Sequence, residues 1–307
     1  MRVAAVDLGT NTTRLLVADV DDGRVAEVHR ETRITRLGED VDARKRLLPL
    51  PVARVRNVLS DYRRTLERLG AERTLAVATS AVRDAENGEA FLGEVEWSYG
   101  FATRLVSGAE EAQLTRRGVE PQAGTLVLDI GGGSTELIVD DFYLSLDMGS
   151  VRYTERFVHT DPPSREELDA CGRAAREALG AEADLHPQRA IGVAGTVTTL
   201  AALDLGLEHY DRERVHGHRL TRTGAAAQLD RLAALPLAER REVPALEPER
   251  APVIVAGALI LLAVLDTYSL DAIEVSERDI LDGIALAAAE LPESDERDAP
   301  PGAYTCC

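Results

Sequence analysis

One short pattern occurs twice in this chain, about 120 residues apart. An apolar strand ends in Asp, and a Gly-led polar turn and a second apolar run follow. The first copy passes through Asp7 and Gly9, and the second passes through Asp129 and Gly131. A polar, Asp-containing turn follows each second run, which is typical of a β-hairpin. The pattern predicts two related domains, each opening with a hairpin, and limits the fold more than any other feature.

The length and the order of elements support this division. A chain of 307 residues exceeds what one hydrophobic core usually serves. Strand and helix patterns alternate after each hairpin, with a third strand expected at 30–37 and a helix at 52–69, so mixed or parallel sheets flanked by helices are expected. We predict an α/β fold with domains at 1–120 and 121–291, in which the last helix can pack back on the first domain. Residues 292–307 are expected to be a disordered tail.

The net charge narrows the classes of partner. It is −18 at pH 7, whereas binding of a nucleic-acid backbone requires a basic stripe, so no nucleic-acid partner is expected. An anionic substrate must therefore find a local basic pocket. Lys45 is the single lysine, and guanidinium groups, which supply almost all other positive charge, suit bidentate phosphate contacts. A composition bias of the source genome is the alternative explanation for most of the arginines.

The N-terminal sequence predicts a cytoplasmic protein, because Asp7 interrupts the first apolar run and no secretory signal is recognisable. The longest apolar run covers residues 253–265. It is shorter than the roughly 20 residues of a membrane-spanning helix, so it predicts a buried helix and no membrane anchor. Cys171, Cys306 and Cys307 have no metal-ligand spacing and imply no disulfide framework.

The two Gly-led turns are candidate phosphate-binding loops. Glycines at strand ends expose consecutive backbone N–H groups and allow close approach of phosphate oxygens. Neither turn is a P-loop, which needs a Lys after its last glycine. Neither has the Gly-x-Gly-x-x-Gly spacing of a dinucleotide-binding loop. A tight hairpin entry is the alternative for one glycine turn, but the matched pair favours phosphate. The candidate phosphate-binding residues are Thr10, Asn11, Gly131, Gly132, Gly133 and Ser134.

The two strand-end aspartates are candidate metal ligands. If the duplicated domains enclose a cleft, Asp7 and Asp129 meet across it, and Mg²⁺ held by one or two carboxylates plus substrate phosphate fits this arrangement. Glu136 could join through a water molecule. The alternative for each of the three acids is a turn cap or a solvated charge.

Two neighbouring glutamates divide into a structural and a catalytic candidate. Ser107 and Glu110 have the spacing of a capping box, so Glu110 is expected to cap a helix. Glu111 projects about 100° further round the helix and is free to reach a water molecule near a bound phosphate. It is the candidate general base, with an exposed first-turn charge as the alternative. Arg83, in the first turn of another helix, could hold the transferring phosphoryl oxygens, or be an ordinary surface arginine.

With these motifs in order, the chain resembles the exopolyphosphatase and guanosine pentaphosphate phosphatase (Ppx/GppA) family, of the short, two-domain type. The likeness extends over residues 3–286 and rests on the motifs at 7–12, 79–83, 106–112, 129–136 and 192–196. The resemblance implies a duplicated actin-like (ribonuclease H-like) fold with the active site in the cleft between domains. It also implies a catalytic glutamate matching Glu111, and phosphate contacts from Arg83, Asn11 and the 131–134 loop. Many relatives have a Gly-x-Arg-Glu-Gly run where this chain has the more acidic residues 276–283.

The function expected from residues and resemblance together is Mg²⁺-dependent release of the terminal phosphate of inorganic polyphosphate by base-assisted attack of water. The first alternative is removal of the 5′-phosphate from guanosine pentaphosphate, which uses the same chemistry. The others are a kinase of the same superfamily and a nucleotide-sensing protein without turnover. A homodimer is left open.

Overall fold

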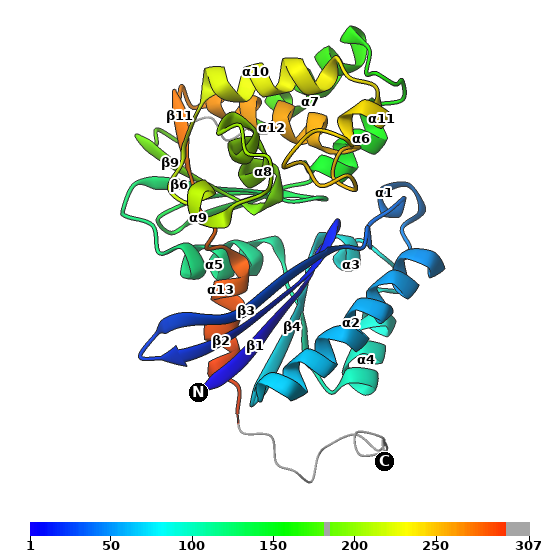
Figure 1. Cartoon of the computed structure of the whole chain (residues 1–307), viewed down its shortest axis with the longest axis vertical. Coiled ribbons are helices and arrows are strands. Elements are labelled where there is room, and N and C mark those ends of the chain that lie inside the picture. Colours follow the sequence, from blue (N-terminus) through cyan, green and yellow to red (C-terminus); the bar gives the residue numbers. More distant parts are fainter. Residues whose placement is uncertain (181–184, 293–307) are drawn as a thin grey trace. The chain divides into compact units, whose positions relative to one another are not determined.

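A computed structural model describes residues 1–180 and 185–292 of the chain (Figure 1). It divides into two compact units. Unit 1 comprises Met1–Val119 together with Ile280 onward, and unit 2 comprises Glu120–Asp279. Apart from Pro292, the residues predicted to form a tail lie outside the described residues, as do Cys306 and Cys307.

Unit 1 is a five-stranded sheet with helices on both faces. The strand order is β3-β2-β1-β4-β5, in which β1 pairs antiparallel with β2 and parallel with β4. The elements in chain order are β1 (Arg2–Leu8), β2 (Thr12–Asp21), β3 (Arg24–Ile34), α1 (Val41–Arg44), α2 (Pro49–Leu69), β4 (Arg73–Ala78), α3 (Ser80–Arg83), α4 (Gly88–Tyr99), β5 (Ala102–Leu105), α5 (Gly108–Val119) and α13 (Ile280–Ala289).

Side chains of β1 point alternately to the two faces of the sheet and so contribute to two hydrophobic cores in unit 1. Ala4 and Val6 point to the core formed with α2 and α4, whereas Val3 and Ala5 point to the core formed with α5 and α13. Helix α13 packs against one face of the sheet of this unit, where it overlaps the strands in Figure 1, although it is the last helix in sequence. The return of α13 therefore completes the sheet face on which α5 packs.

Unit 2 repeats the strand order of unit 1. In its six-stranded sheet, β10-β11-β9-β6-β7-β8, the strands β6, β7, β8, β9 and β11 have the same neighbours and directions as β1 to β5, and β10 is added at the edge. Its elements are β6 (Thr125–Ile130), β7 (Thr135–Val139), β8 (Phe142–Leu146), α6 (Ser150–Phe157), α7 (Arg165–Leu179), β9 (Arg189–Val193), α8 (Ala194–Asp204), α9 (Arg212–Val215), β10 (Arg219–Thr221), α10 (Arg222–Ala233), α11 (Leu237–Arg240), α12 (Ile254–Thr267) and β11 (Ala272–Val275). A mixed sheet in this order, present twice, is the duplicated actin-like fold, and the predicted fold class is confirmed.

The first hairpin corrects the position predicted for the third strand. That strand was expected at 30–37, but β3 starts at Arg24 and ends at Ile34. Asp22 and Gly23 have φ of 45° and 76°, as in the tight turns that join antiparallel strands. Because the turn has only two residues, Asp21 pairs directly with Arg24 and the strand begins at once.

The longest apolar run forms a buried helix, as predicted. Helix α12 packs against α6, α7, α8 and α10 inside unit 2. In residues 1–180 and 185–292, no helix combines the length and the apolar character of a membrane span. Cys171 is a buried free thiol in α7.

The start of α7 predicts an acid-sensitive element. Glu167 accepts hydrogen bonds from the hydroxyl of Thr160 and from the backbone N–H groups of Ser164 and His159, and these lower its pKa from 4.5 to about 2. A lowered pKa adds stability that is complete above the unfolded value and is lost as the pH falls from about 4.5 to about 2. We expect Glu167→Gln to reduce the dependence of the unfolding midpoint on pH in this range. Glu166→Gln, at an exposed neighbouring position, should not, and equal curves for both variants would contradict the assignment.

Candidate active site

The first predicted phosphate turn joins β1 to β2 in unit 1. The N–H of Gly9 donates to the Thr12 carbonyl at 2.9 Å, which closes the turn. Asn11 is only 6% exposed, and neither its amide nitrogen nor its amide oxygen has a hydrogen-bond partner among the described residues. An unsatisfied buried amide costs about 1–3 kcal/mol. A phosphate oxygen accepting from Nδ2 would satisfy the amide nitrogen, which fits the predicted role of Asn11.

Arg83 and Glu111 form a pair in the same unit. Arg83, the last residue of α3, donates through Nη1 to the Val106 carbonyl at 2.9 Å and to Glu111 Oε2 at 3.2 Å. Glu111 lies in the first turn of α5 and is 8% exposed. The Val106 carbonyl thus fixes the guanidinium, and the guanidinium offsets the charge of the carboxylate. The pair places a carboxylate that can act as a base beside a cation that suits phosphate.

Glu110 has the separate, structural role predicted from its spacing. Its Oε2 accepts from the N–H and the hydroxyl of Ser107, both at 2.8 Å, and its own N–H donates to the Ser107 hydroxyl at 3.3 Å. The bond from the Ser107 N–H, followed by that from the hydroxyl, lowers the pKa of Glu110 below 4.5. The capping box is therefore confirmed, and Glu110 is engaged in starting α5.

The second predicted phosphate loop leaves β6 in unit 2 and is held from one side by α6. The Gly131 carbonyl accepts from Ser150 N at 2.9 Å, the Gly132 carbonyl from Val151 N at 2.8 Å, and the Gly133 carbonyl from Arg152 Nε at 2.7 Å. In a trans peptide the N–H points opposite to the C=O. The N–H groups of the three residues that follow these carbonyls, Gly132, Gly133 and Ser134, therefore point away from α6. Consecutive backbone N–H groups that point the same way can bind an anion.

Sequence reasoning did not single out two residues that shape this loop, Gly149 and Arg152. A Cβ on Gly149 would lie 2.3 Å from the Gly132 carbonyl oxygen. Arg152 is buried, and its bond to the Gly133 carbonyl is described above. The only sequence feature that points to Gly149 and Arg152 is the Gly-Ser pair at 149–150, which lies between a strand and a helix.

We expect Gly149→Ala to damage the loop without straining its own backbone. Its φ of −134° and ψ of 162° are open to any residue, so the effect is steric. The loop must move by about 1 Å, which predicts a roughly 100-fold lower kcat/KM for phosphate release and about 1–3 kcal/mol lower stability. Steady-state kinetics and thermal unfolding measure both effects. Unchanged kinetics would mean that this loop does not hold the substrate.

The two hairpins place different partners beside their aspartates. Asp7 is opposite Arg14 in the register of β1 and β2, and Arg14 Nε donates to Asp7 Oδ2 at 2.8 Å. Asp129 is instead opposite Glu136, whose Oε1 accepts from the Ser145 hydroxyl at 2.7 Å. Like charges directly opposite on a sheet are unfavourable, and a cation relieves the repulsion. The carboxylates of Asp129 and Glu136 are oxygen donors of the kind that Mg²⁺ prefers, and the Asp7 carboxylate forms an ion pair with Arg14.

No compact protein cage for a metal ion is present in the described residues, because no group of three His, Cys, Asp or Glu side chains there has suitable geometry. Magnesium does not require one, since it usually keeps several waters and binds one or two carboxylates together with substrate phosphates. The pair of Asp129 and Glu136 satisfies that minimum. The predicted metal role of these acids stays a prediction.

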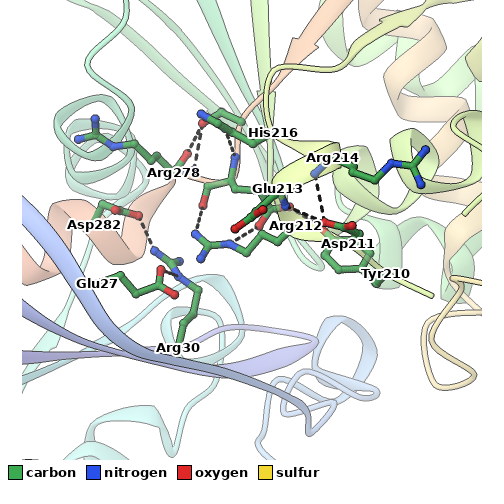
Figure 2. Close-up of polar contacts among 12 residues, drawn as sticks. Glu27, Arg30, Tyr210, Asp211, Arg212, Glu213, Arg214, His216, Arg278 and Asp282 are labelled. Carbon is green, nitrogen blue, oxygen red and sulfur yellow. Dashed lines mark hydrogen bonds and ion pairs between the residues drawn. The ribbon is translucent and has the colours of Figure 1, made fainter.

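The acidic segment 276–283 contributes paired rather than free carboxylates (Figure 2). In unit 2, Glu277 Oε2 accepts from Arg212 Nε at 2.8 Å, and its other oxygen accepts from the Tyr210 hydroxyl. In unit 1, Asp282 Oδ2 accepts from Arg30 Nη2 at 2.9 Å. Each of these two acids is matched by an arginine, so the segment adds less negative charge than its sequence suggests.

Comparison with known proteins identifies the family. The sequence pattern of the Ppx/GppA phosphatase family matches residues 16–290. The chain belongs to this family. Among Ppx/GppA proteins, Exopolyphosphatase 2 of Mycobacterium tuberculosis is 39% identical, over 94% of this chain and 98% of that protein. The guanosine-5′-triphosphate,3′-diphosphate pyrophosphatase of Vibrio vulnificus is 30% identical, over 96% of this chain and 61% of that protein.

A solved structure of a Ppx/GppA relative agrees with the architecture. The crystal structure of an exopolyphosphatase-like protein is 34% identical, covers 95% of this chain and 100% of that one, and has a TM-score of 0.88. The family resemblance inferred from the five motifs is thus confirmed.

Proposed function

We propose that the protein is a Mg²⁺-dependent exopolyphosphatase, which releases the terminal phosphate of inorganic polyphosphate by attack of water. One observation carries the proposal: the buried Glu111 carboxylate is held 3.2 Å from Arg83, and the Val106 carbonyl anchors Arg83 in turn. A fixed carboxylate beside a fixed guanidinium supplies a base for water and a cation for the phosphoryl oxygens.

The proposed reaction is a single displacement at phosphorus. Glu111 accepts a proton from water while the water oxygen bonds to the terminal phosphorus. The bridging P–O bond breaks, and the shortened chain leaves with the electron pair. Arg83 offsets charge on the transferring oxygens, and the Asn11 amide and the N–H groups of residues 132–134 hold the phosphates. Positioning and electrostatics provide most of the rate in such transfers.

The proposal assigns roles to acidic residues of each unit. Asp129 and Glu136 would hold Mg²⁺ from unit 2, and Asp7 would act with Arg14 from unit 1. When bound, the metal neutralises negative charge on the phosphates. The proposal also places the reaction in the cytoplasm, which rests on the sequence prediction alone.

Removal of the 5′-phosphate from guanosine pentaphosphate is the second candidate, because a relative named for that class of substrate is 30% identical. The chemistry at the terminal phosphate is the same, and only the rest of the substrate differs. The higher identity to an exopolyphosphatase, 39% over nearly the whole of both chains, favours polyphosphate.

The test is phosphate release from long polyphosphate, tripolyphosphate and guanosine pentaphosphate in parallel, with and without Mg²⁺. The proposal predicts Mg²⁺-dependent release from polyphosphate at the highest kcat/KM. Release from guanosine pentaphosphate alone would make the second candidate correct. Nucleotide binding without any release would point to a sensor, and phosphate transfer that requires an added acceptor would point to a kinase.

A further inference from the structure

A segment of unit 1, residues 35–47, is fixed to both phosphate-binding elements of that unit, and we call it the strap. At its start, the N–H groups of Thr35 and Arg36 donate to the Asn11 carbonyl at 3.0 and 2.9 Å, and Gly38 N donates to the Thr10 carbonyl at 2.8 Å. The strap is therefore bonded directly to the predicted phosphate turn.

Close packing brings the start of the strap against α3 as well. A Cβ on Gly38 would lie 2.3 Å from Thr10 Cγ2 and 3.1 Å from Ala81 Cβ. Ala81 belongs to α3, the helix that ends at Arg83. Gly38 thus lies where the Asn11 turn and the Arg83 helix come together, and a larger residue there would have to displace the Thr10 side chain.

The end of the strap is bonded just beyond Arg83. Glu86 N donates to the Lys45 carbonyl at 2.8 Å. The Asn87 side chain both accepts from Leu47 N, at 2.8 Å, and donates to the Leu47 carbonyl, at 3.1 Å. Lys45 therefore lies beside the residue three positions after Arg83, in the same unit as the candidate base.

Three residues of the strap adopt an uncommon backbone conformation with positive φ. Arg36, Asp40 and Lys45 have φ of 50°, 60° and 53°, and they are three of the nine non-glycine residues with positive φ in the described part of the chain. Backbone in this region persists only where the surroundings determine it, and such positions gather at functional sites.

The charge of the strap differs from that of the protein as a whole. Residues 44–46 are the only three consecutive cations in a chain of net charge −18, and they include its single lysine. All three side chains are exposed. Arg44 and Lys45 meet acids of the strap only loosely, at 3.4 Å from Asp40 and 3.8 Å from Asp42, and Arg46 forms no ion pair with the described residues. Exposed pairs of this kind are weak, so a densely charged polyanion can replace them.

We propose that the strap is a subsite for the phosphates behind the terminal one, with Lys45 and Arg46 as specificity-determining cations for a long polyphosphate chain. This inference rests on the proposed function, because the terminal phosphate must occupy the Asn11 and Arg83 site. A substrate of many phosphates gains from the strap, whereas tripolyphosphate is too short to gain equally.

The test compares two charge-matched double variants of the full chain. Lys45→Gln/Arg46→Gln removes the strap cations, and Arg64→Gln/Arg68→Gln removes two exposed arginines of α2. We expect the strap variant to bind long polyphosphate roughly tenfold more weakly by calorimetry, as two exposed charge pairs imply. Its ratio of kcat/KM for long polyphosphate to that for tripolyphosphate should fall by the same factor. The α2 variant should match the wild type in both measurements.

Three outcomes would overturn the subsite: equal weakening in both variants, an equal loss on tripolyphosphate, or no loss of binding. The binding measurement does not depend on turnover. If the wild-type protein released no phosphate but the strap variant still bound polyphosphate more weakly, the proposed enzymatic function would be wrong and the subsite would stand. If turnover were normal and binding were unaffected, only the subsite would be wrong.

Discussion

Glu111→Gln is expected to lower kcat for phosphate release roughly 10²- to 10⁴-fold, the usual contribution of a general base. The amide keeps the size of the side chain and can still contact Arg83, but it cannot accept the proton of the attacking water. Substrate binding should therefore persist. Rapid mixing with polyphosphate, followed by phosphate detection, measures kcat, and calorimetry on the inactive variant measures binding.

Glu110→Gln is the matched control, because it removes the same charge one residue earlier in the same helix. Glu110 is engaged with Ser107, so its loss should lower the melting temperature slightly and leave kcat near that of the wild type. Near-normal turnover in Glu111→Gln would remove Glu111 as the base. Equal losses in both variants would attribute the effect to the start of α5 rather than to the chemistry.

Gly283→Ala should produce the largest loss of stability among single-methyl changes. A Cβ on Gly283 would lie 1.9 Å from the Leu114 carbonyl oxygen and 2.7 Å from its carbon. The contact joins α13 to α5, and neither backbone can yield as a flexible side chain would. We expect about 3 kcal/mol less free energy of unfolding by urea titration. Activity should also fall, because α5 carries Glu111 three residues before Leu114.

Gly93→Ala supplies the comparison, since Gly93 lies inside α4 and a Cβ there would meet nothing within 4 Å. Alanine has the higher helix propensity, so this variant should gain up to about 1 kcal/mol. A neutral effect of Gly283→Ala would show that α13 and α5 pack less closely than the structure describes.

Local patterns made much of this protein predictable from its sequence. The duplicated strands, the buried helix α12 and the capping box of Glu110 each follow from spacing within a few residues. The distinction between Glu110 and Glu111 needed only helix geometry and a cap. The third strand was misplaced because residues 24–29 do not alternate strictly between apolar and polar side chains, and the turn at Asp22 and Gly23 decides the pairing instead.

Features that depend on distant segments could not be predicted in this way. Gly38, Gly149 and Gly283 are required by backbones or side chains that approach from elsewhere in the fold, and no short pattern around them reports this. Asp7 lies opposite Arg14, whereas Asp129 lies opposite Glu136, and this difference depends on the register of the strands. The placement of the strap against Thr10 and Asn87 is likewise a tertiary property.

Hydrolysis of polyphosphate in water enriched in oxygen-18 tests the central claim most directly, namely that water attacks the terminal phosphorus. Mass spectrometry of the products locates the label. Attack of water at the terminal phosphorus predicts one labelled oxygen in each released orthophosphate and none in the shortened chain, with the reaction lost in Glu111→Gln. Label in the remaining chain, or phosphate that passes to another acceptor without incorporating label, would contradict it.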